Sequence, residues 1–401
     1  MRIDNPPRGR LAAYFQRLDE RAARSGGPER VNRLDLGTHA VRLVNHAAEF
    51  VPHVEKQLAY ALKDEAPRHD ATLVIWRERD IASLSRALDE RCDPRKNPRL
   101  RVQKLAAGNM PDWEIRNLQA LQVFDERYSR HHPLVNIDMQ NGILSAHNPE
   151  SGTFYYAPEN LEPEEFIKQG HIFVQTFNKL LKTPVSGLAH AALVGLNGKG
   201  ALICARGQRG KSTLAVRALL DGFDYVSDDY LVLGREGDGL YAWPIYSVIT
   251  LSPLMYGDLY HRLNAKFVSN NARKDKYVFN ISGYHDRFVS RHPVSLCLFP
   301  QIVPDPEPSV APCTPAGRGR AVTQLVHSTI NQMGDAHDIA TVRKLVNFVK
   351  DLPFYQISLC RDTDKNLRRL RTFLETGACD RQAGAGRDIS SRAAPHAVFA
   401  P

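Results

Sequence analysis

Residues 201–213 read Ala-Leu-Ile-Cys-Ala-Arg-Gly-Gln-Arg-Gly-Lys-Ser-Thr, and this segment is the clearest indication of the fold class. The apolar run ends at Ala205, a loop with two glycines follows, and a helix is expected over Lys211–Leu220. A buried strand over residues 223–226 then leads to Ser227-Asp228-Asp229. Strand, glycine loop, helix, strand and acid follow the order of a P-loop βαβ unit. We therefore expect an α/β nucleotide-binding core.

The loop predicts a phosphate site. Its glycines allow backbone N–H groups to converge on a phosphate, and the following helix adds the positive end of its dipole. Lys211, expected to be an exposed loop charge, would contact the β- and γ-phosphates, and the Ser212 hydroxyl would bind Mg²⁺. The predicted nucleotide-binding residues are Ala205, Arg206, Gly207, Gln208, Arg209, Gly210, Lys211, Ser212 and Thr213. Arg206 and Arg209 either contact phosphates or face solvent, and both interpretations stay open.

Two acids follow the next predicted strand. Asp228 and Asp229 would lie at the carboxyl end of a parallel strand, where ligands bind in open α/β sheets. Neighbouring side chains on an extended chain point in different directions. One acid can therefore accept a proton while the other holds Mg²⁺, directly or through water. Ser212 and Asp229 are the predicted metal ligands.

These segments resemble the HPr kinase/phosphorylase family and the broader set of HPr-kinase-like serine kinases. In that family a histidine begins the strand before the P-loop strand, a Gly-Lys-Ser loop follows, and a later strand ends in Asp-Asp. The matching stretches here are residues 188–192, 202–213 and 225–229. The resemblance implies an HPr-kinase/PEP-carboxykinase-like P-loop fold that uses ATP and Mg²⁺. It also implies that Asp228 is the base for a substrate hydroxyl, with Asp229 beside it and His190 near the transferred phosphate. A histidine on an apolar strand can equally be a core residue whose ring nitrogens are hydrogen-bonded within the protein.

The sequence departs from this family at several positions. Ala205 stands where the family has glycine, and Gly207-Gln208 stands where it has Ser-Gly. A metal-binding glutamate of the family has no match in residues 243–258. These departures argue against HPr as the substrate and against phosphorolysis. The expected function is transfer of the γ-phosphate of ATP to a serine hydroxyl of a protein or peptide. A kinase for a small hydroxylated metabolite and a non-catalytic nucleotide-binding regulatory protein are the alternatives.

The chain is expected to contain an N-terminal α+β extension and a kinase domain. The extension, residues 1–160, has β-prone runs at 71–76 and 133–147, the second with Asn141-Gly142 as a hairpin signal. It would either recognise the substrate or complete the sheet of the kinase domain, residues 161–378. A polar segment over 264–279 is expected to be a mobile loop. Residues 379–401 are rich in Gly, Ala, Ser and Arg and are expected to be a disordered tail.

The composition of the chain limits the kinds of binding partner to be expected. The 401 residues include 53 Lys and Arg against 44 Asp and Glu, a formal charge of +9. This excess suits an anionic ligand, but the basic residues are scattered, so no nucleic-acid binding is expected. No apolar run approaches the ~18 residues that a membrane span needs, and the first residues lack an apolar signal region. The six cysteines have no zinc-site spacing. We expect a cytoplasmic protein without a membrane partner.

Overall fold

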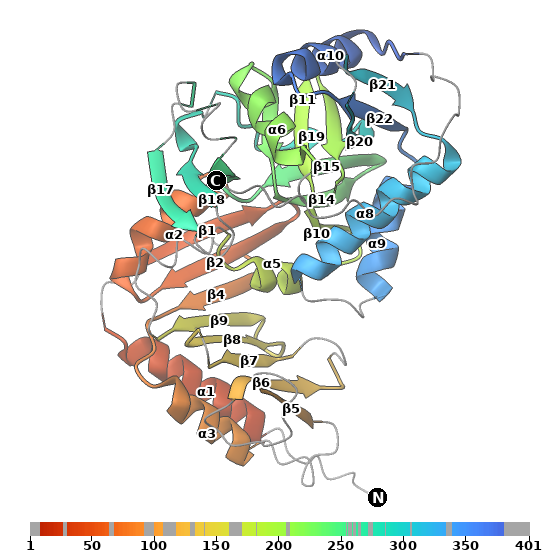
Figure 1. Cartoon of the computed structure of the whole chain (residues 1–401). Coiled ribbons are helices and arrows are strands. Elements are labelled where there is room, and N and C mark those ends of the chain that lie inside the picture. Colours follow the sequence, from red (N-terminus) through yellow and green to blue (C-terminus); the bar gives the residue numbers. More distant parts are fainter. Residues whose placement is uncertain are drawn as a thin grey trace, which may run out of the picture.

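A computed structural model describes most of the chain. The described residues are 9–26, 30–63, 68–91, 100–106, 118–128, 133–139, 141–159, 171–181, 183–205, 209–253, 255, 259, 262–263, 266–271, 276–284, 286–304, 307–333 and 339–380. These residues form a mixed α/β structure with four sheets. A large sheet lies in the lower part of Figure 1, and the three smaller sheets lie above it.

The N-terminal part forms one nine-stranded sheet, ordered β3-β1-β2-β4-β9-β8-β7-β6-β5. The strands are β1 (Arg30–Leu36), β2 (His39–Asn45), β3 (Leu62–Lys63), β4 (Ala71–Ile75), β5 (Leu100–Ala106), β6 (Leu118–Asp125), β7 (Val135–Asp138), β8 (Ile143–Asn148) and β9 (Thr153–Pro158). β4 pairs in parallel with both β2 and β9. The carboxyl ends of these three strands therefore lie at one edge of the sheet. β7 and β8 pair antiparallel with Asp138 opposite Ile143, so the hairpin signalled by Asn141-Gly142 is confirmed, although its connection runs over residues 139–142 and is longer than a two-residue turn.

Helices cover both faces of this sheet because alternate strand residues point to opposite sides. On one face, α1 (Gly9–Arg24) and α3 (Ile81–Arg91) bury Leu18 and Leu84 against Val74 and Tyr155. On the other, the 3₁₀ turn η1 (Ala48–Phe50), α2 (Val51–Leu58) and α5 (Val174–Leu180) pack over Leu73 and its neighbours. Apolar residues at helical spacing predict a helix over residues 163–181. α5 is the described part of it, since residues 160–170 lie outside the described residues.

Three sheets form the rest of the molecule. A four-stranded sheet contains β10 (Ser186–His190), β14 (Tyr230–Glu236), β15 (Gly239–Pro244) and β19 (His292–Pro293). A six-stranded sheet has the order β13 (Asp224–Ser227), β11 (Ala192–Leu196), β12 (Lys199–Ile203), β20 (Leu296–Ile302), β22 (Phe354–Leu359) and β21 (Ser309–Pro312). A three-stranded sheet contains β16 (Val248–Leu251), β18 (Lys276–Asn280) and β17 (Lys266–Asn271).

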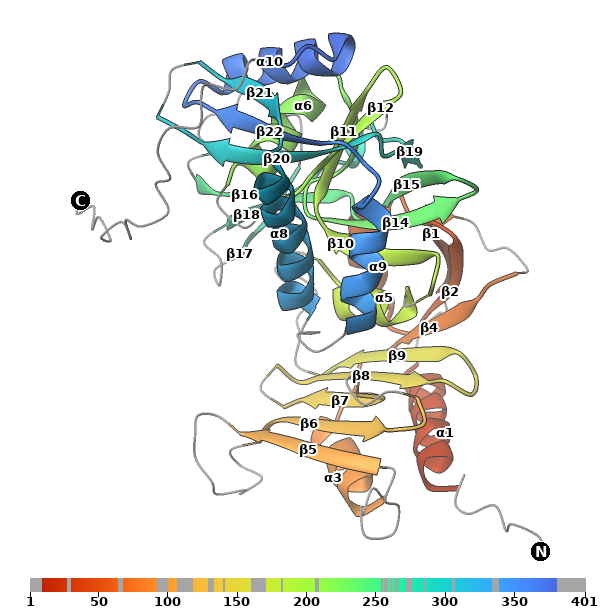
Figure 2. The ribbon, with the colours of Figure 1, turned by 90° about the vertical axis from the view of Figure 1, so that its right-hand side faces the viewer.

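Two helix pairs sandwich the six-stranded sheet. α6 (Lys211–Leu220) and α10 (Thr363–Thr376) bury Leu214 and Leu370 against Ile203 and its neighbours on one face. α8 (Pro315–Met333) and α9 (Ile339–Val349) bury Leu325 and Leu345 on the opposite face. α8 and α9 lie side by side in Figure 2. No helix within the described residues is long and apolar enough to cross a membrane.

The apolar run after residue 186 changes sheets. Residues 190–196 are apolar and strand-like, which predicts a single strand, but β10 ends at His190 and β11 begins at Ala192 in another sheet. Ala191 is fully buried where the chain crosses between the two sheets. The single-strand prediction is wrong because an apolar pattern reports burial and not the identity of the neighbouring strand.

Two other expectations are corrected by the structure. Residues 266–271 and 276–280 of the expected mobile loop pair as β17 and β18, while residues 272–275 lie outside the described part. The expected disordered tail begins with structured residues, because the Asp380 carboxylate accepts the Val310 N–H at 2.6 Å and pairs with Arg369 at 2.7 Å. Residues 381–401 lie outside the described residues.

One hydrophobic cluster joins the nine-stranded sheet to the remainder. Leu34 and Leu73 of the large sheet belong to the same buried cluster as Val232 and Trp243 of the four-stranded sheet. Ser247 adds polar contacts, since its backbone N–H donates to the Gln57 carbonyl at 2.7 Å and its hydroxyl donates to the Lys56 carbonyl at 2.8 Å. The face of the large sheet that η1, α2 and α5 cover is therefore also packed against the second half of the chain.

Candidate functional site

The candidate site lies where the six-stranded sheet meets the four-stranded sheet. β12 leads through the glycine loop to α6, and β13 leads to Asp228 and Asp229. β12 and β13 run in the same direction, but antiparallel β11 separates them. The sequence prediction of a parallel strand before the two acids is therefore wrong in its pairing. The carboxyl ends of β12 and β13 still lie at the same edge of the sheet.

Gly210 is required at the start of α6. Its φ of +87° lies in the left-handed region, and a Cβ atom there would lie 2.7 Å from Leu359 Cδ1. The Gly210 carbonyl accepts the Leu214 N–H at 2.9 Å and begins the helical hydrogen bonding. Ala205 is fully buried just after β12, Arg209 is exposed, and Arg206, Gly207 and Gln208 lie outside the described residues. The Thr213 hydroxyl points at Met255 Sδ, 3.0 Å away.

Lys211 is buried, and the expectation of an exposed loop charge is wrong. Its side chain is 6% exposed. The Nζ atom donates to the Asp228 backbone carbonyl and lies 3.3 Å from Asp229 Oδ1. The reason is local: α6 begins directly at Lys211, so its side chain reaches across the sheet edge to the turn after β13.

Asp229 gathers three nitrogen groups around one carboxylate. His190 Nε2 forms a hydrogen bond with Oδ1, and His171 Nδ1 lies 3.5 Å from Oδ2. Burial alone would raise the pKa of Asp229, but Lys211, His190 and His171 hold that pKa well below its ordinary value. Asp229 is therefore held as an anion beside Lys211, and its low pKa makes it a poor proton acceptor.

Strand register brings His190 to Asp229. β10 and β14 pair antiparallel with His190 opposite Tyr230, the residue that follows Asp229. The His190 backbone N–H donates to the buried Thr329 hydroxyl of α8 at 2.9 Å. His190 is thus fixed from both sides, by a neighbouring strand and by a helix on the sheet face. The sequence allowed two roles for His190, a core residue or a residue of the site. In the structure, His190 contacts Asp229, one of the two predicted acids.

Asp228 is held by an aromatic hydroxyl. The Tyr225 hydroxyl donates to Asp228 Oδ1 at 3.2 Å, and only 2% of Asp228 is exposed. Burial and the neighbouring Asp228 carboxylate raise the pKa of Tyr225 well above its ordinary value, so the phenol stays protonated and can donate. Phe288 contacts the Tyr225 ring edge-on at 4.9 Å and stacks on Tyr60 at 3.7 Å.

Three residues of the site, His171, Tyr225 and Thr329, were not among those predicted from the sequence. His171 precedes α5 and approaches Asp229 from the side of the nine-stranded sheet, with its ring edge-on to Tyr230 and Tyr246 at 4.8 and 4.7 Å. Tyr225 lies within the strand that leads to Asp228, three residues earlier, so its position carried a weak signal. His171 and Thr329 are distant in the sequence from both motifs, and no local pattern marked them.

The oxygen donors present fit Mg²⁺ in their chemistry. Mg²⁺ is commonly held by one or two carboxylates together with substrate phosphates and water. Ser212 is the second residue of α6 and carries a hydroxyl, and the Asp229 carboxylate lies 3.3 Å from Nζ of the preceding Lys211. Among the described residues, no group of three or more His, Cys, Asp or Glu side chains forms a metal cluster. A metal ion here would depend on phosphate oxygens for the rest of its coordination shell.

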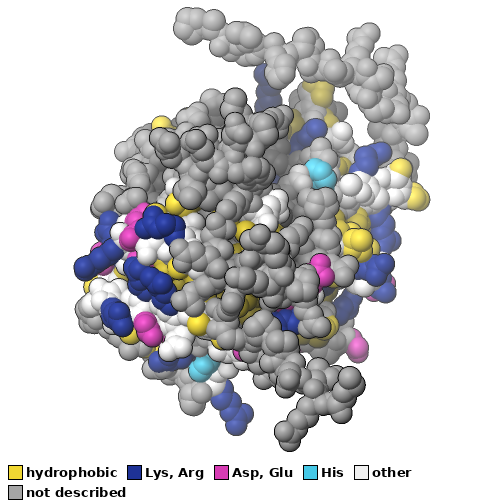
Figure 3. All heavy atoms as spheres, turned by 90° about the horizontal axis from the view of Figure 1, so that it is seen from below, with side chains coloured by type: hydrophobic (Ala, Val, Ile, Leu, Met, Phe, Trp, Pro, Cys, Tyr) yellow, Lys and Arg dark blue, Asp and Glu magenta, His cyan; other side chains and the backbone are white. Residues whose placement is uncertain are grey.

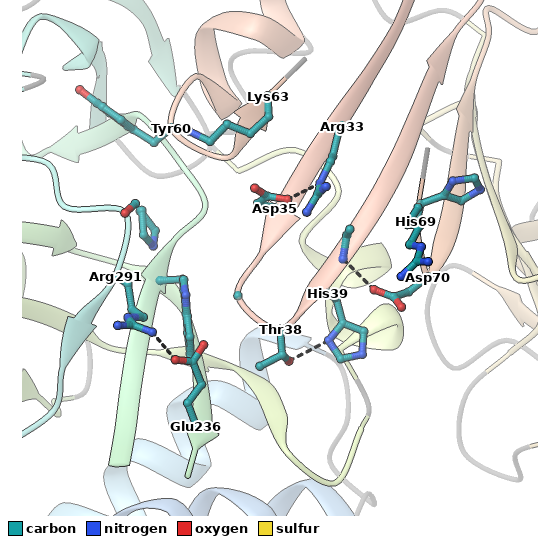
Figure 4. A pocket seen from close by; sticks show the side chains of 16 residues that line it. Arg33, Asp35, Thr38, His39, Tyr60, Lys63, His69, Asp70, Glu236 and Arg291 are labelled. Carbon is teal, nitrogen blue, oxygen red and sulfur yellow. Dashed lines mark hydrogen bonds and ion pairs between the residues drawn. The ribbon is translucent and has the colours of Figure 1, made fainter. Parts of the chain in front are cut away.

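A second pocket lies between the nine-stranded sheet and the β14–β15 hairpin. Its volume is about 1170 Å³, and Figure 4 shows its charged lining. Arg33 pairs with Asp35 at 2.6 Å, and Arg291 pairs with Glu236. Tyr60 also lines it, so the Tyr60–Phe288–Tyr225 contacts run from this pocket to Asp228. The lining residues are Arg33, Asp35, Gly37, Thr38, His39, Ala40, Tyr60, Lys63, Arg68, His69, Asp70, Glu236, Trp243, Pro244, Ser290 and Arg291.

Comparisons with known proteins give limited information. No family model matches the chain, and no curated protein sequence matches it. Among solved structures, the chain has a weak similarity to the HPr(Ser) kinase/phosphatase from Coxiella burnetii, with a TM-score of 0.25 and 16% identity. The aligned part covers 48% of this chain and 99% of that one. A similarity at this level does not establish a family for the chain, so the function rests on the geometry of the site.

Proposed function

We propose that this protein is a phosphotransferase that uses ATP and Mg²⁺ to phosphorylate a serine hydroxyl of a protein or peptide. The observation that supports this best is the meeting of Lys211, at the start of α6, with the Asp228-Asp229 pair. A helix start after a glycine with positive φ can bind phosphate through backbone N–H groups and one lysine. The two acids next to it supply the further groups that phosphoryl transfer needs.

The proposed reaction uses Asp228 as the base. The acceptor hydroxyl oxygen forms a bond to the γ-phosphorus, the bond from that phosphorus to the β–γ bridging oxygen breaks, and ADP leaves. The hydroxyl proton passes to Asp228. The hydrogen bond from Tyr225 to Oδ1 orients this carboxylate. Asp229 is the poorer candidate base because its low pKa reduces its basicity.

Lys211 would change partners when ATP binds. In this structure Nζ contacts the Asp228 carbonyl and the Asp229 carboxylate. A triphosphate at the start of α6 would offer Nζ stronger, charged acceptors. His190 and His171 would then remain as the neighbours of Asp229. Bound Mg²⁺ would neutralise developing charge on the phosphates, with Ser212 and Asp229 as its proposed protein ligands.

The pocket in Figure 4 supports recognition of the acceptor by the N-terminal region. Eleven of its sixteen lining residues come from residues 33–70, and five come from the second half of the chain. Its volume exceeds the ~300–1000 Å³ usual for small-molecule sites, and its walls carry both charges. A peptide segment therefore suits it better than a small hydroxylated metabolite.

The proposal is tested by Asp228→Asn, which keeps the side-chain shape but removes the proton acceptor. The purified chain is incubated with Mg-ATP and a peptide library, and phosphorylated products are identified by mass spectrometry. Transfer should fall by about 10²–10⁴-fold in the variant, the range of general-base catalysis, while affinity for a non-hydrolysable ATP analogue is retained. Tyr225→Phe is the matched control, because it removes only the orienting hydrogen bond and should retain most of the turnover.

The alternatives predict different results. A wild-type chain that binds the ATP analogue but phosphorylates neither peptides nor metabolites of a cell extract would be a non-catalytic nucleotide-binding protein. Near-wild-type turnover in Asp228→Asn would assign the base elsewhere.

A further inference from the structure

A separate pocket with five arginines lies at the far side of the nine-stranded sheet. This arginine pocket has a volume of about 640 Å³ and is lined by Ala13, Gln16, Arg17, Glu20, Arg21, Arg24, Ser25, Trp76, Arg77, Glu78 and Arg79. All of these residues belong to α1 with the residue after it, or to the segment between β4 and α3. None belongs to the proposed kinase site. The view from below in Figure 3, the side on which α1 and α3 lie, shows Lys and Arg side chains gathered at its left.

The arginine pocket lies at a position in the sheet that favours ligand binding. The segment 76–79 follows β4, which pairs in parallel with β2 and β9. Ligands of α/β proteins bind outside the carboxyl ends of parallel strands, because the chain leaves the sheet there and opens a crevice. α1 forms the opposite wall of this crevice. It presents Arg17, Arg21 and Arg24 from one side, because residues separated by three or four positions lie on the same face of a helix.

The buried Glu78 organises this wall. Its carboxylate accepts Arg21 Nη1 and Trp76 Nε1 at 2.7 and 3.2 Å. It also accepts the backbone N–H groups of Arg79 and Asp80 at 2.8 and 3.1 Å. The Glu78 side chain is only 2% exposed. The negative charge of Glu78 is therefore balanced by these donors, which hold Arg21 and the turn at residues 78–80 in place. The buried carboxylate contributes little repulsion to an anion in the pocket.

Two of the five arginines in the pocket have no acidic partner among the described residues. Arg24 pairs with Glu20 at 3.6 Å, and Arg77 pairs with Glu49 at 3.6 Å. Arg17 and Arg79 line the same pocket without an ion pair or side-chain hydrogen bond to another residue in the described part of the chain. Arginine presents a planar set of donors that matches the oxygens of phosphate. Two such side chains facing one crevice form a site for a multiply charged anion.

We propose that the arginine pocket binds a small phosphate-bearing ligand, with Arg17 and Arg79 as its main contacts. The pocket volume lies within the ~300–1000 Å³ range of small-molecule sites. The shared chemistry is a phosphate group with at least two negative charges, which a phosphorylated side chain, a nucleotide or a free diphosphate can supply. This site is distinct from the phosphate site at Lys211, and its existence does not depend on phosphoryl transfer.

The test uses inorganic pyrophosphate and isothermal titration calorimetry. The full-length chain carries Lys211→Met so that the loop before α6 contributes little to the signal. Pyrophosphate should bind with saturation, and the added pair Arg17→Gln and Arg79→Gln should weaken it at least about tenfold, as expected for loss of charge-assisted hydrogen bonds. The matched control carries Arg86→Gln and Arg361→Gln, two exposed arginines outside the pocket, and should bind as the parent does.

Each outcome decides the proposal. Absence of saturable binding, or an equal loss of affinity in the control, overturns it. O-phosphoserine and AMP are titrated in parallel, and the probe that binds tightest in an Arg17- and Arg79-dependent manner identifies the source of the phosphate. If circular dichroism shows that the double variant is unfolded, the single variants Arg17→Gln and Arg79→Gln replace it. Full affinity in both folded single variants then overturns the proposal.

Discussion

At the scale of single residues, the site is defined by buried charges that depend on one another. Lys211 and Asp229 are both largely buried, and each is the other's neutralising partner. Removing one partner of a buried pair leaves an uncompensated charge, which is strongly destabilising. Substitutions here must therefore be chosen to separate loss of function from loss of folding.

Lys211→Met should weaken binding of an ATP analogue while preserving most of the side-chain volume. A charge-assisted hydrogen bond contributes about 1.5–3 kcal/mol, so affinity should fall roughly tenfold to a hundredfold. Isothermal titration measures the affinity, and a urea titration of the same variant reports its stability. The Lys365→Met variant is the control, since that lysine pairs with Glu307 at the surface. Unchanged affinity in folded Lys211→Met would remove the phosphate-site assignment.

Asp229 should make the protein more stable above pH ~4 than below it. Its pKa in the folded chain is lower than in the unfolded chain, so its contribution is fully present above the unfolded value and is lost as pH falls through the folded one. Asp229→Asn removes this contribution. The difference in unfolding free energy between wild type and variant should therefore be constant near neutral pH and shrink below pH ~4. Chemical denaturation at a series of pH values measures it, and a difference that grows on acidification would contradict the ion-pair role.

At the scale of helices and strands, α6 and the strands around it could be predicted because their signals are local. The predicted helix Lys211–Leu220 is confirmed in its bounds, since glycines flank an amphipathic run. The division between β10 and β11 could not be predicted, because His190 and Ala192 lie in one apolar run and differ only in their neighbours across the sheets. His171 was missed for a similar reason: its approach to Asp229 depends on how the nine-stranded sheet packs against the rest.

Gly210→Ala should destabilise the protein more than Gly237→Ala. Both glycines have positive φ, +87° and +56°, so both substitutions carry the backbone strain of about 1–3 kcal/mol. A Cβ at Gly210 would also meet Leu359, whereas a Cβ at Gly237 would have nothing within 4 Å. The difference between the two variants in urea denaturation therefore isolates the contact at the start of α6. Equal losses would show that α6 can shift to accommodate a methyl group.

At the scale of the whole molecule, the sequence suggested an N-terminal extension followed by a kinase domain, and the structure shows a core shared across that boundary. Leu34, Leu43 and Leu73 pack in one cluster with Val232 and Trp243. No sequence pattern could report this contact, because apolar strand residues look alike whether they pack on a helix or on a distant sheet. The role of the N-terminal region in acceptor choice stays a prediction.

A chain that begins at residue 163 should be insoluble or aggregate. It would expose the apolar residues of β14, β15 and β16 that the nine-stranded sheet covers, and a large exposed apolar patch promotes association. Size-exclusion chromatography and binding of a hydrophobic dye measure this. The matched control ends at residue 380, retains Asp380 and its contact with Arg369, and should remain monodisperse. A soluble, ATP-binding fragment from residue 163 would show that the covered face is dispensable.

The crossing of the chain between sheets at Ala191 has a consequence for the order of folding. Lys211 is placed by the six-stranded sheet, His190 by the four-stranded sheet, and His171 by the segment beside the nine-stranded sheet. No single sheet therefore carries all three of these side chains. A partly folded chain cannot bring them together, so the proposed phosphoryl transfer would require the three parts to have docked.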